Sequence, residues 1–263
     1  MKRLLAALIT LMPTAVPAVD LELRDIWKLS FPSSLAFDPQ LCGLWIANES
    51  RELVLVNIFG EEFRRFETPL SMIKTVAPTE EFVIVSDNAG NFVRMSRQGD
   101  ILEGPFEWNE RLWDTEGVVS LPDGDILVVQ DTPAHIIRVN PAGDVVSELK
   151  GMELSPRMTE PQGIALDPQS GHIFVTDDWE GSNSLFEFSA DLDLLSVTPL
   201  IEYGVDPEGI AVHPNSGTMY IAFDQGRKVS VFNYTPAGDP LSPAIDVPDA
   251  CGISIFSNGK SPV

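Results

Sequence analysis

Short apolar runs alternate with turn-forming residues along almost the whole chain, and each run has the length of a β-strand. Five of these runs are rich in β-branched and aromatic residues and end in an acidic or amide residue. They are Leu44–Asn48, Phe82–Asp87, Ile126–Asp131, Ile173–Asp177 and Met219–Asp224. Gly, Pro, Asn and Asp separate them from further short runs, which is typical of strands and turns. No segment beyond residues 1–18 keeps a 3.6-residue period, so the pattern predicts an all-β fold.

The apolar runs belong to a repeating unit. Pro161–Gly171 reads PQGIALDPQSG, and Pro207–Gly217 repeats it as PEGIAVHPNSG. Weaker copies begin at Pro32, near Ser71, at Thr115 and at Ala250. Four short strands repeated at intervals of about 40 to 50 residues predict the blades of a β-propeller. A β-sandwich would not repeat one motif at one phase along the whole chain.

Six repeat starts predict six blades, of which the last is incomplete. Only Lys260–Val263 follows Gly259, which is too short for another hairpin. The N-terminal segment Leu21–Leu29 reads as one strand. We therefore expect five full blades and a sixth with Ile253–Phe256 as its inner strand and Leu21–Leu29 as its outer strand, in a single domain over residues 19–263. The alternative is that the chain is a shortened version of a longer relative.

The first 18 residues have the pattern of a signal peptide. Lys2 and Arg3 precede the apolar run Leu4–Met12, and small residues follow up to Ala18. This order predicts cleavage after Ala18 and a periplasmic or secreted protein. The run is too short to span a bilayer, and no later segment approaches the roughly 20 apolar residues that a spanning helix needs.

The charge balance is strongly acidic and narrows the range of partners. The chain has 17 basic and 39 acidic residues, a formal net charge of −22, and 44% hydrophobic residues, the last being typical of a globular protein. Such a surface repels nucleic acid and favours cations or basic partners. We expect a monomer that binds a small molecule, a glycan or a protein, and no nucleic acid.

The residue that precedes the glycine of a repeat start, or that stands at the matching position where the glycine is missing, is the main candidate for chemistry. In a propeller the inner strands run along the central axis, so equivalent residues of successive blades converge near one mouth of the channel. These positions are Ser33, Ser71, Glu116, Gln162, Glu208 and Cys251. Two carboxylates and an amide are hard oxygen donors, so Glu116, Gln162 and Glu208 are predicted to bind a divalent cation, with Ca²⁺ first. Alternatively, the two glutamates only line a water-filled channel or bond neighbouring strand amides.

Two family resemblances follow from these motifs. Glu208–Gly217 and the strand Met219–Asp224 resemble the NHL-type six-bladed propellers, and the closest likeness is to the exported SdiA-regulated propellers. Phe31–Ala47 looks like the first blade of that group, with Ser34 in place of its glycine. The resemblance covers about the whole mature chain as a pattern of repeats and implies the fold, not a reaction.

A more distant resemblance is to the SMP-30/gluconolactonase propellers, which hold one divalent metal on the axis. Their ligands are a Glu, an Asn and an Asp, each just before the glycine of a first-strand motif. Here only Glu116, Gln162 and Glu208 offer suitable oxygens, so the Asn and Asp are not reproduced. The resemblance implies a metal-dependent lactonase or esterase in which the two glutamates are general acid and base. Because the third ligand differs, we favour a binding module over this hydrolase.

Several other residues admit a structural interpretation. The acids that end the second strands, Asp87, Asp131, Asp177 and Asp224, are expected to accept backbone N–H bonds in Asx turns, since they recur in most blades. Asp177–Glu180 with Asn183 offers a possible surface cation site but lacks the alternating spacing of a calcium loop. The histidines 135, 172 and 213 stand in three different blades, which argues against a zinc hydrolase.

The longest connection between blades lies just before Glu116. Trp108 and Trp113 flank it and are predicted to form a lid over the channel, or simply a longer loop. Cys42 and Cys251 are expected at opposite ends of their strands, too far apart for a disulfide. We therefore expect two free and mostly buried thiols.

Overall fold

The computed structural model describes residues 32–57, 59–107, 114–179, 183–225, 228–232, 240–246 and 252–254. Within these ranges the chain forms five four-stranded sheets, and consecutive strands pair antiparallel in every one. One turn of 3-10 helix, η1 (Gly151–Glu153), is the helical element of this part of the chain. No helix within the same ranges is long and apolar enough to cross a membrane.

The strand bounds are as follows. The first sheet holds β1 (Pro32–Asp38), β2 (Gly43–Asn48), β3 (Glu52–Asn57) and β4 (Glu62–Glu67). The second holds β5 (Ile73–Pro78), β6 (Val83–Asp87), β7 (Asn91–Met95) and β8 (Ile101–Glu107). The third holds β9 (Thr115–Ser120), β10 (Ile126–Gln130), β11 (His135–Val139) and β12 (Val145–Lys150). The fourth holds β13 (Pro161–Leu166), β14 (Ile173–Asp177), β15 (Ser184–Phe188) and β16 (Leu194–Pro199). The fifth holds β17 (Val205–Val212), β18 (Met219–Gln225), β19 (Lys228–Phe232) and β20 (Pro240–Asp246).

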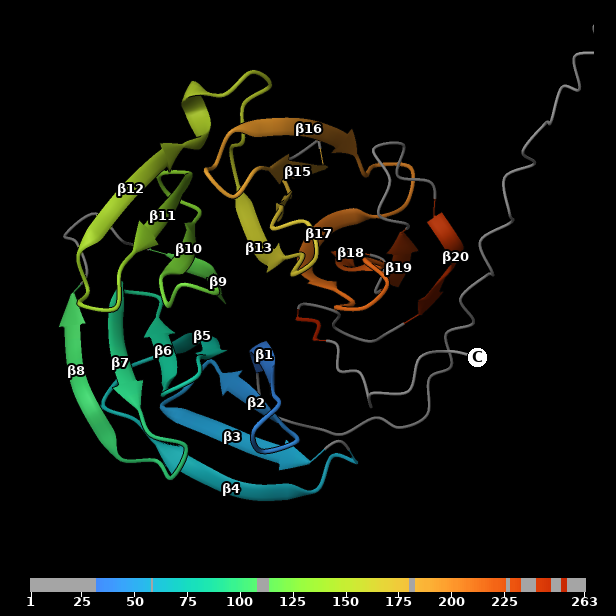
Figure 1. Ribbon diagram of the computed structural model, residues 1–263. Coiled ribbons are helices and arrows are strands. Elements are labelled where there is room, and N and C mark those ends of the chain that lie inside the picture. The colour runs from blue at the N-terminus through green and yellow to red at the C-terminus, as the bar shows by residue number, and fades with distance from the viewer. Residues whose placement is uncertain are drawn as a thin grey trace, which may run out of the picture.

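The sheets follow one another around a common centre, as the blades of a propeller do (Figure 1). The first strand of each sheet lies nearest the centre and the fourth lies outside. Successive inner strands contact each other in the order β1, β5, β9, β13, β17. The all-β, propeller-like arrangement predicted from the repeats is therefore confirmed.

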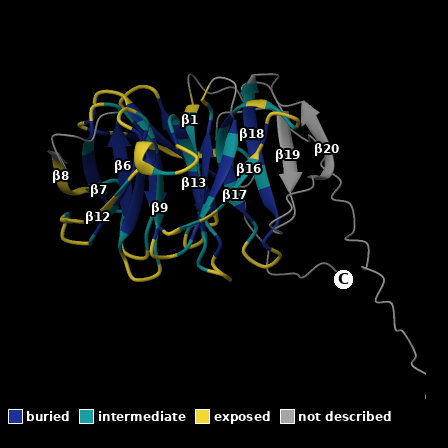
Figure 2. Ribbon diagram, turned by 90° about the horizontal axis from the view of Figure 1, so that it is seen from above, coloured by how far each residue is buried: buried dark blue, intermediate teal, exposed yellow. Residues whose placement is uncertain are grey.

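The hydrophobic core lies between neighbouring blades. One cluster joins the first two sheets through Trp45, Leu53, Val83 and Val93, all of them fully buried. Similar clusters join the later sheets in sequence. A blade inside such a stack is covered on both faces, so its second strand is buried at every position rather than at alternate ones. Figure 2 shows this burial in the strands and the exposed residues in the turns.

A buried ion pair fastens the first blade to the second. The Asp38 carboxylate is fully buried and accepts a hydrogen bond of 2.8 Å from Nε of Arg97 and one of 2.9 Å from Nε1 of Trp45. Arg97 also donates to the carbonyl of Thr79. Both charges are satisfied by partners, which makes the burial tolerable.

Most of the predicted sixth blade lies outside the described residues, including Leu21–Leu29. Residues 252–254 are described, and they lie beside β1. Oγ of Ser254 accepts a hydrogen bond of 2.9 Å from the backbone N–H of Phe37. A Cβ atom on Gly252 would lie 3.5 Å from the backbone nitrogen of Leu35. This segment therefore packs against the inner strand of the first blade.

Candidate functional site

Each of the five inner strands carries an irregularity near its start. The pairing of every inner strand with its second strand shifts register at this point. A β-bulge of this kind inserts one extra residue and redirects its side chain, so that the side chain no longer follows the regular alternation between the two faces of the sheet. The residues at the shifts are Ser33, Lys74, Glu116, Gln162 and Glu208, which we call the mouth ring.

The glycine after the ring residue is required by packing between blades. A Cβ atom on Gly117 would lie 2.8 Å from the carbonyl oxygen of Gln162, and one on Gly163 would lie 2.3 Å from that of Glu208. Both distances are shorter than real Cβ contacts, so only glycine lets the next inner strand approach this closely. In the repeated Glu/Gln–Gly pair, the glycine is thus required by packing, whereas the residue before it can vary.

Hydrogen bonds between blades hold the ring residues in place. Oγ1 of Thr176 donates to the carbonyl oxygen of Glu208 at 2.6 Å and accepts from the N–H of Gly163 at 2.8 Å. Oγ of Ser33 lies 3.0 Å from the carbonyl oxygen of Lys74, to which it donates. The bonds from Thr176 to Glu208 and from Ser33 to Lys74 connect neighbouring blades next to the ring, and the bond between Thr176 and Gly163 lies within the fourth blade.

The structure corrects one predicted ring position. Ser71 is exposed, precedes β5 and donates a hydrogen bond of 3.4 Å to Asp87, so it does not line the channel. Its place is taken by Lys74, which stands at the register shift of β5 as the other ring residues stand at the shifts of their strands. The second blade lacks the Glu/Gln–Gly motif, and the sequence phase was therefore misjudged by three residues.

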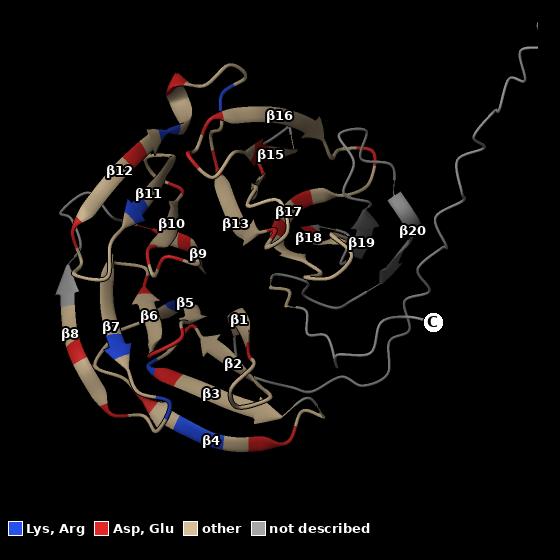
Figure 3. Ribbon diagram, viewed as in Figure 1, with Lys and Arg blue, Asp and Glu red and all other residues tan. Residues whose placement is uncertain are grey.

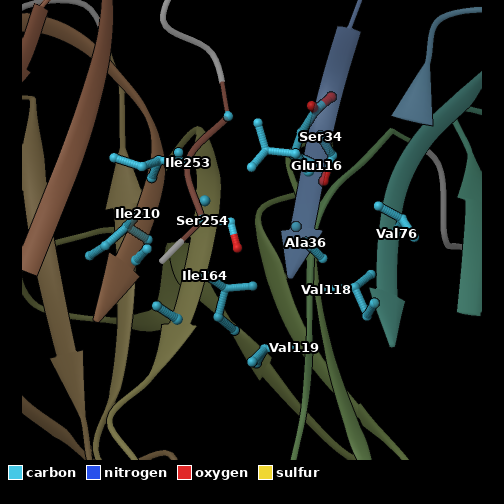
Figure 4. A pocket seen from close by; sticks show the side chains of 18 of the residues that line it. Ser34, Ala36, Val76, Glu116, Val118, Val119, Ile164, Ile210, Ile253 and Ser254 are labelled. Atoms are coloured by element: carbon cyan, nitrogen blue, oxygen red, sulfur yellow. The ribbon is translucent and has the colours of Figure 1, made fainter. Parts of the chain in front are cut away.

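A central cavity of about 350 Å³ lies inside the ring of inner strands. Ser33, Glu116, Gln162 and Glu208 line it, together with backbone and side chains further along the same strands. Below the ring, Figure 4 shows Val118, Val119, Ile164 and Ile210 on the inner strands. Val76, Ile164 and Ile210 are themselves buried in the clusters between blades. The exposed wall is more polar than apolar, so the cavity combines a charged mouth with a largely polar interior.

Glu116 is held in a mixed electrostatic environment. Burial, opposed by the charge of Lys74 and supported by the neighbouring Asp114 and Asp131, raises the pKa of Glu116 to about 7. Nζ of Lys74 lies 3.7 Å from Oε1 of Glu116 and 3.4 Å from Oε1 of Glu49. Lys74 is thus shared between two carboxylates and leaves the mouth negative.

Glu208 belongs to a group of three acids. Oxygen atoms of Asp178, Asp206 and Glu208 all lie within 4.8 Å of one another, and we call this group the carboxylate triad. Burial first, and then the charges of Asp206, Glu116 and Asp224, raise the pKa of Glu208 to about 8. Burial and a hydrogen bond shared with Asp206 also raise the pKa of Asp178. Figure 3 shows acidic residues on β9 and β17, the inner strands that carry Glu116 and Glu208.

The acids that end the second strands behave differently from one another. Oδ1 of Asp87 accepts hydrogen bonds from the N–H groups of Ala89 and Asn91, as an Asx turn requires. The carboxylate of Asp177 accepts bonds from three backbone N–H groups. Oδ1 of Asp131 is buried without a partner among the described residues, and burial raises the pKa of Asp131 to about 6. The turn interpretation therefore holds for Asp87 and for the structural role of Asp177.

Several predicted residues fall elsewhere. Cys251, Trp108 and Trp113 lie outside the described residues. Cys42 is a free thiol but is exposed, contrary to the expected burial, because it stands in the β1–β2 turn with a φ of 47°. His135 and His172 pair with Glu148 and Glu187 on outer parts of their blades and do not line the cavity.

Asp206 is the site residue that sequence reasoning missed. It stands two residues before Glu208, as Asp114 stands two residues before Glu116. Both have left-handed backbones, with φ of 65° and 58°. The recurring acid-x-Glu pattern was the available signal, since an Asp tolerates this conformation better than most residues.

Comparisons with known proteins identify the fold. No family model matches the chain, and no curated protein matches it. A streptogramin B lyase structure superimposes with a TM-score of 0.62 at 18% identity, covering 83% of this chain and 70% of that chain. The H270A virginiamycin B lyase from Staphylococcus aureus with quinupristin gives 0.60 at 17% identity, over 83% and 71%. A chain of a nidogen–laminin complex gives 0.68 at 12% identity, over 85% and 84%.

These neighbours are β-propeller proteins. At such low identity the likeness concerns the fold alone. A propeller scaffold carries both binding and enzymatic functions, so the function has to be argued from the cavity itself.

Proposed function

We propose that this protein is an exported propeller that binds a ligand or partner at the mouth of its central cavity, with a divalent cation held there by carboxylates. The observation that supports the cation is the carboxylate triad, whose oxygens lie within 4.8 Å of one another. Three carboxylates at this spacing suit Ca²⁺, which takes several oxygen ligands in flexible geometry. Oδ1 of Asp178 is buried and receives no hydrogen bond from the described residues, so it is available as a ligand.

The proposal differs from the set inferred from sequence. Glu208 is common to both, whereas Asp178 and Asp206 replace Glu116 and Gln162 as its nearest oxygen donors. Glu116 lies close enough for its charge to raise the pKa of Glu208, so it adds to the negative electrostatic potential at the mouth. A bound cation would relieve the mutual repulsion that these raised pKa values express.

Thermal melting of the mature protein tests the cation. At a free Ca²⁺ concentration one hundred times its Kd, the bound ion stabilises the fold by about 2.7 kcal/mol. For a chain of this size that corresponds to a rise in Tm of roughly 5–10 °C over the value in EDTA. Glu208→Gln and Asp178→Asn are expected to abolish the rise, while Glu202→Gln, at an exposed position, preserves it.

Two outcomes would count against this site. Equal melting temperatures in EDTA and in millimolar Ca²⁺ would refute the cation. Loss of the rise in Gln162→Ala, with retention in Asp178→Asn, would instead place the ion at the set predicted from sequence, Glu116, Gln162 and Glu208.

A metal-dependent lactonase or esterase is the second candidate function. It is favoured by the pKa of Glu116, raised to about 7, and that of Glu208, raised to about 8, because groups poised near neutral pH serve general acid–base catalysis. The described cavity lining includes no histidine, so the two glutamates would have to carry the proton transfers. Turnover of simple lactones or aryl esters that is lost in both Glu116→Gln and Glu208→Gln would support this function.

The proposal also covers the number of blades, the family and the export of the protein. We propose six blades, of which 252–254 forms part of the last, because this segment packs against β1 as inner strands pack on one another. We also propose that the chain is related to the NHL-type propellers of the SdiA-regulated group. Export predicts that the mature protein begins at Val19, which N-terminal sequencing of periplasmic or secreted material checks. A mature chain that still begins at Met1 would contradict it.

A further inference from the structure

A buried asparagine connects the fourth blade to the carboxylate triad. Asn183 precedes β15 and is 2% exposed, so it does not offer the surface cation ligand that the sequence suggested. Its side-chain Oδ1 accepts a hydrogen bond of 2.6 Å from the backbone N–H of Asp206. Asp206 is the member of the triad that lies at the start of β17. The bond therefore crosses from the fourth blade to the fifth and ends at the triad.

The backbone that carries Asp206 needs such support. Asp206 has a φ of 65°, in the left-handed region that residues other than glycine seldom adopt. The segment before it is also tied to Asn183, whose main-chain carbonyl accepts a bond of 2.7 Å from the N–H of Leu200. The carbonyl of Leu200 in turn accepts bonds from the N–H groups of Tyr203 and Gly204. Asn183 thus holds both ends of the connection from Leu200 to Asp206.

The third blade holds the equivalent residue in another way. Asp114, two residues before Glu116, occupies the matching place and has a φ of 58°. Its backbone N–H donates to the main-chain carbonyl of Asn88, in the second blade, at 3.0 Å. Both aspartates are therefore anchored on the preceding blade, but at Asp206 the acceptor is a side chain. A substitution can remove that acceptor, whereas it cannot remove a main-chain carbonyl.

The position of the Asp206 carboxylate determines the geometry of the triad. Its side chain forms a hydrogen bond with Asp178, and an oxygen of each lies within 4.8 Å of one on Glu208. A cation held by three carboxylates needs all of them at ligand distance at the same time. Loss of a group that orients a metal ligand typically lowers the affinity for the metal about 10- to 100-fold.

We propose that Asn183 is a positioning residue of this site: it holds the backbone of Asp206 and thereby places its carboxylate beside Asp178 and Glu208. This inference rests on the proposed function, because it takes the carboxylate triad as the cation site. It adds a residue that acts through Asp206 rather than as a ligand, and that couples the fourth blade to the fifth.

Calorimetric titration with Ca²⁺ and amide hydrogen exchange followed by NMR, both on the mature protein, test the inference. In wild type the Asp206 N–H should exchange slowly, because it is bonded to a buried acceptor. Asn183→Ala removes the acceptor, so exchange at Asp206 should be at least about tenfold faster and the affinity for Ca²⁺ about 10- to 100-fold lower. Asn183→Asp is isosteric and keeps an oxygen that can accept the bond, so it should retain slow exchange and bind Ca²⁺ at least as tightly as wild type.

Asn140→Ala is the matched control. Oδ1 of Asn140 accepts bonds from the N–H groups of Ala142 and Asp144, at 3.0 and 2.9 Å, in the β11–β12 turn and away from the cavity lining. This variant should leave both the Ca²⁺ affinity and the exchange at Asp206 unchanged. An equal loss of affinity in the two alanine variants would show an effect of stability alone and would overturn the inference.

Three further results would overturn it. Loss of Ca²⁺ affinity in Asn183→Ala with unchanged exchange at Asp206 would make Asn183 a ligand, and faster exchange with unchanged affinity would make its role purely structural. If Asn183→Ala does not fold, the decision rests on the other proteins. Fast exchange of the Asp206 N–H in wild type, or weaker Ca²⁺ binding by Asn183→Asp, would then contradict the inference.

The two measurements separate this inference from the proposed function. Wild-type protein that binds no Ca²⁺ refutes the proposed function. Exchange at Asp206 is decided independently of the metal: acceleration in Asn183→Ala supports the hold of Asn183 on Asp206, and no acceleration overturns it.

Discussion

Replacing Glu208 by glutamine should stabilise the metal-free protein in alkaline solution. The side chain is half-buried on the cavity wall, and its pKa is raised from 4.5 to about 8, first by burial and then by Asp206, Glu116 and Asp224. A carboxyl group whose pKa is higher in the folded state binds protons more tightly when folded. The stability associated with it is complete below about pH 4.5 and is lost progressively as the pH rises to about 8.

The magnitude follows from the same pKa. At about 1.4 kcal/mol per pKa unit, ionised Glu208 would cost the fold at most about 5 kcal/mol above pH 8. Part of this cost is mutual repulsion with the acids nearby, which can take up a proton in its place. We therefore expect Glu208→Gln to gain about 2–3 kcal/mol at pH 9, or roughly 4–12 °C in Tm, and nothing at pH 4.5.

The assay is thermal melting by circular dichroism in EDTA, from pH 4.5 to pH 9, for wild type, Glu208→Gln and the surface control Glu202→Gln. In saturating Ca²⁺ the order should reverse, since only wild type keeps the ion. A difference between variant and wild type that does not change with pH would refute the reasoning, because it would show that Glu208 is not a desolvated carboxyl group.

Three substitutions test the framework that positions the mouth. Asp38→Ala leaves the nearly buried guanidinium of Arg97 without its carboxylate and should cost about 3–5 kcal/mol in urea unfolding; a loss below about 1 kcal/mol would show that the pair is well hydrated. Gly163→Ala places a Cβ atom 2.3 Å from the carbonyl oxygen of Glu208 and should cost about 1–3 kcal/mol, measured in the same way. Thr176→Val removes the acceptor of the Gly163 N–H and the donor to Glu208, and should cost about 1–3 kcal/mol; unchanged stability would mean that water replaces the hydroxyl group.

The strands were readable from the sequence because each blade is buried on both faces. A strand such as β14 is buried at every position and is bounded by turn residues, so its predicted and observed limits coincide. The recurring glycine shows which residues of the inner strands β13 and β17 are equivalent. In β13 the position of this glycine is set by contact with the next blade. In β5 that glycine is replaced by Thr75, and the ring position was misplaced to Ser71.

The sequence predicts the residues of the site less completely than it predicts the strands. Glu116, Gln162 and Glu208 lie on the cavity wall, because position along an inner strand determines which residues meet at the axis. Which of them share a ligand depends on acids outside the repeated motif. Asp178 approaches Glu208 from the turn after β14, and Asp206 approaches it from the start of β17. The acid-x-Glu pattern indicated Asp206, but no periodicity in the sequence reports the approach of Asp178.

The mouth ring shows why the repeats reveal the fold more readily than the function. The bulge and the following glycine are fixed by packing, since a side chain on Gly117 or Gly163 would collide with the neighbouring blade. The ring residue itself is free to vary, and the five positions hold serine, lysine, glutamate, glutamine and glutamate. All of them except Lys74 line the cavity. The chemistry of the mouth is therefore determined by one residue per blade and by the acids next to it, such as Asp178 and Asp206 beside Glu208. Exchange of a ring residue should change what the cavity binds at little cost to the fold, whereas exchange of the adjacent glycine should do the opposite.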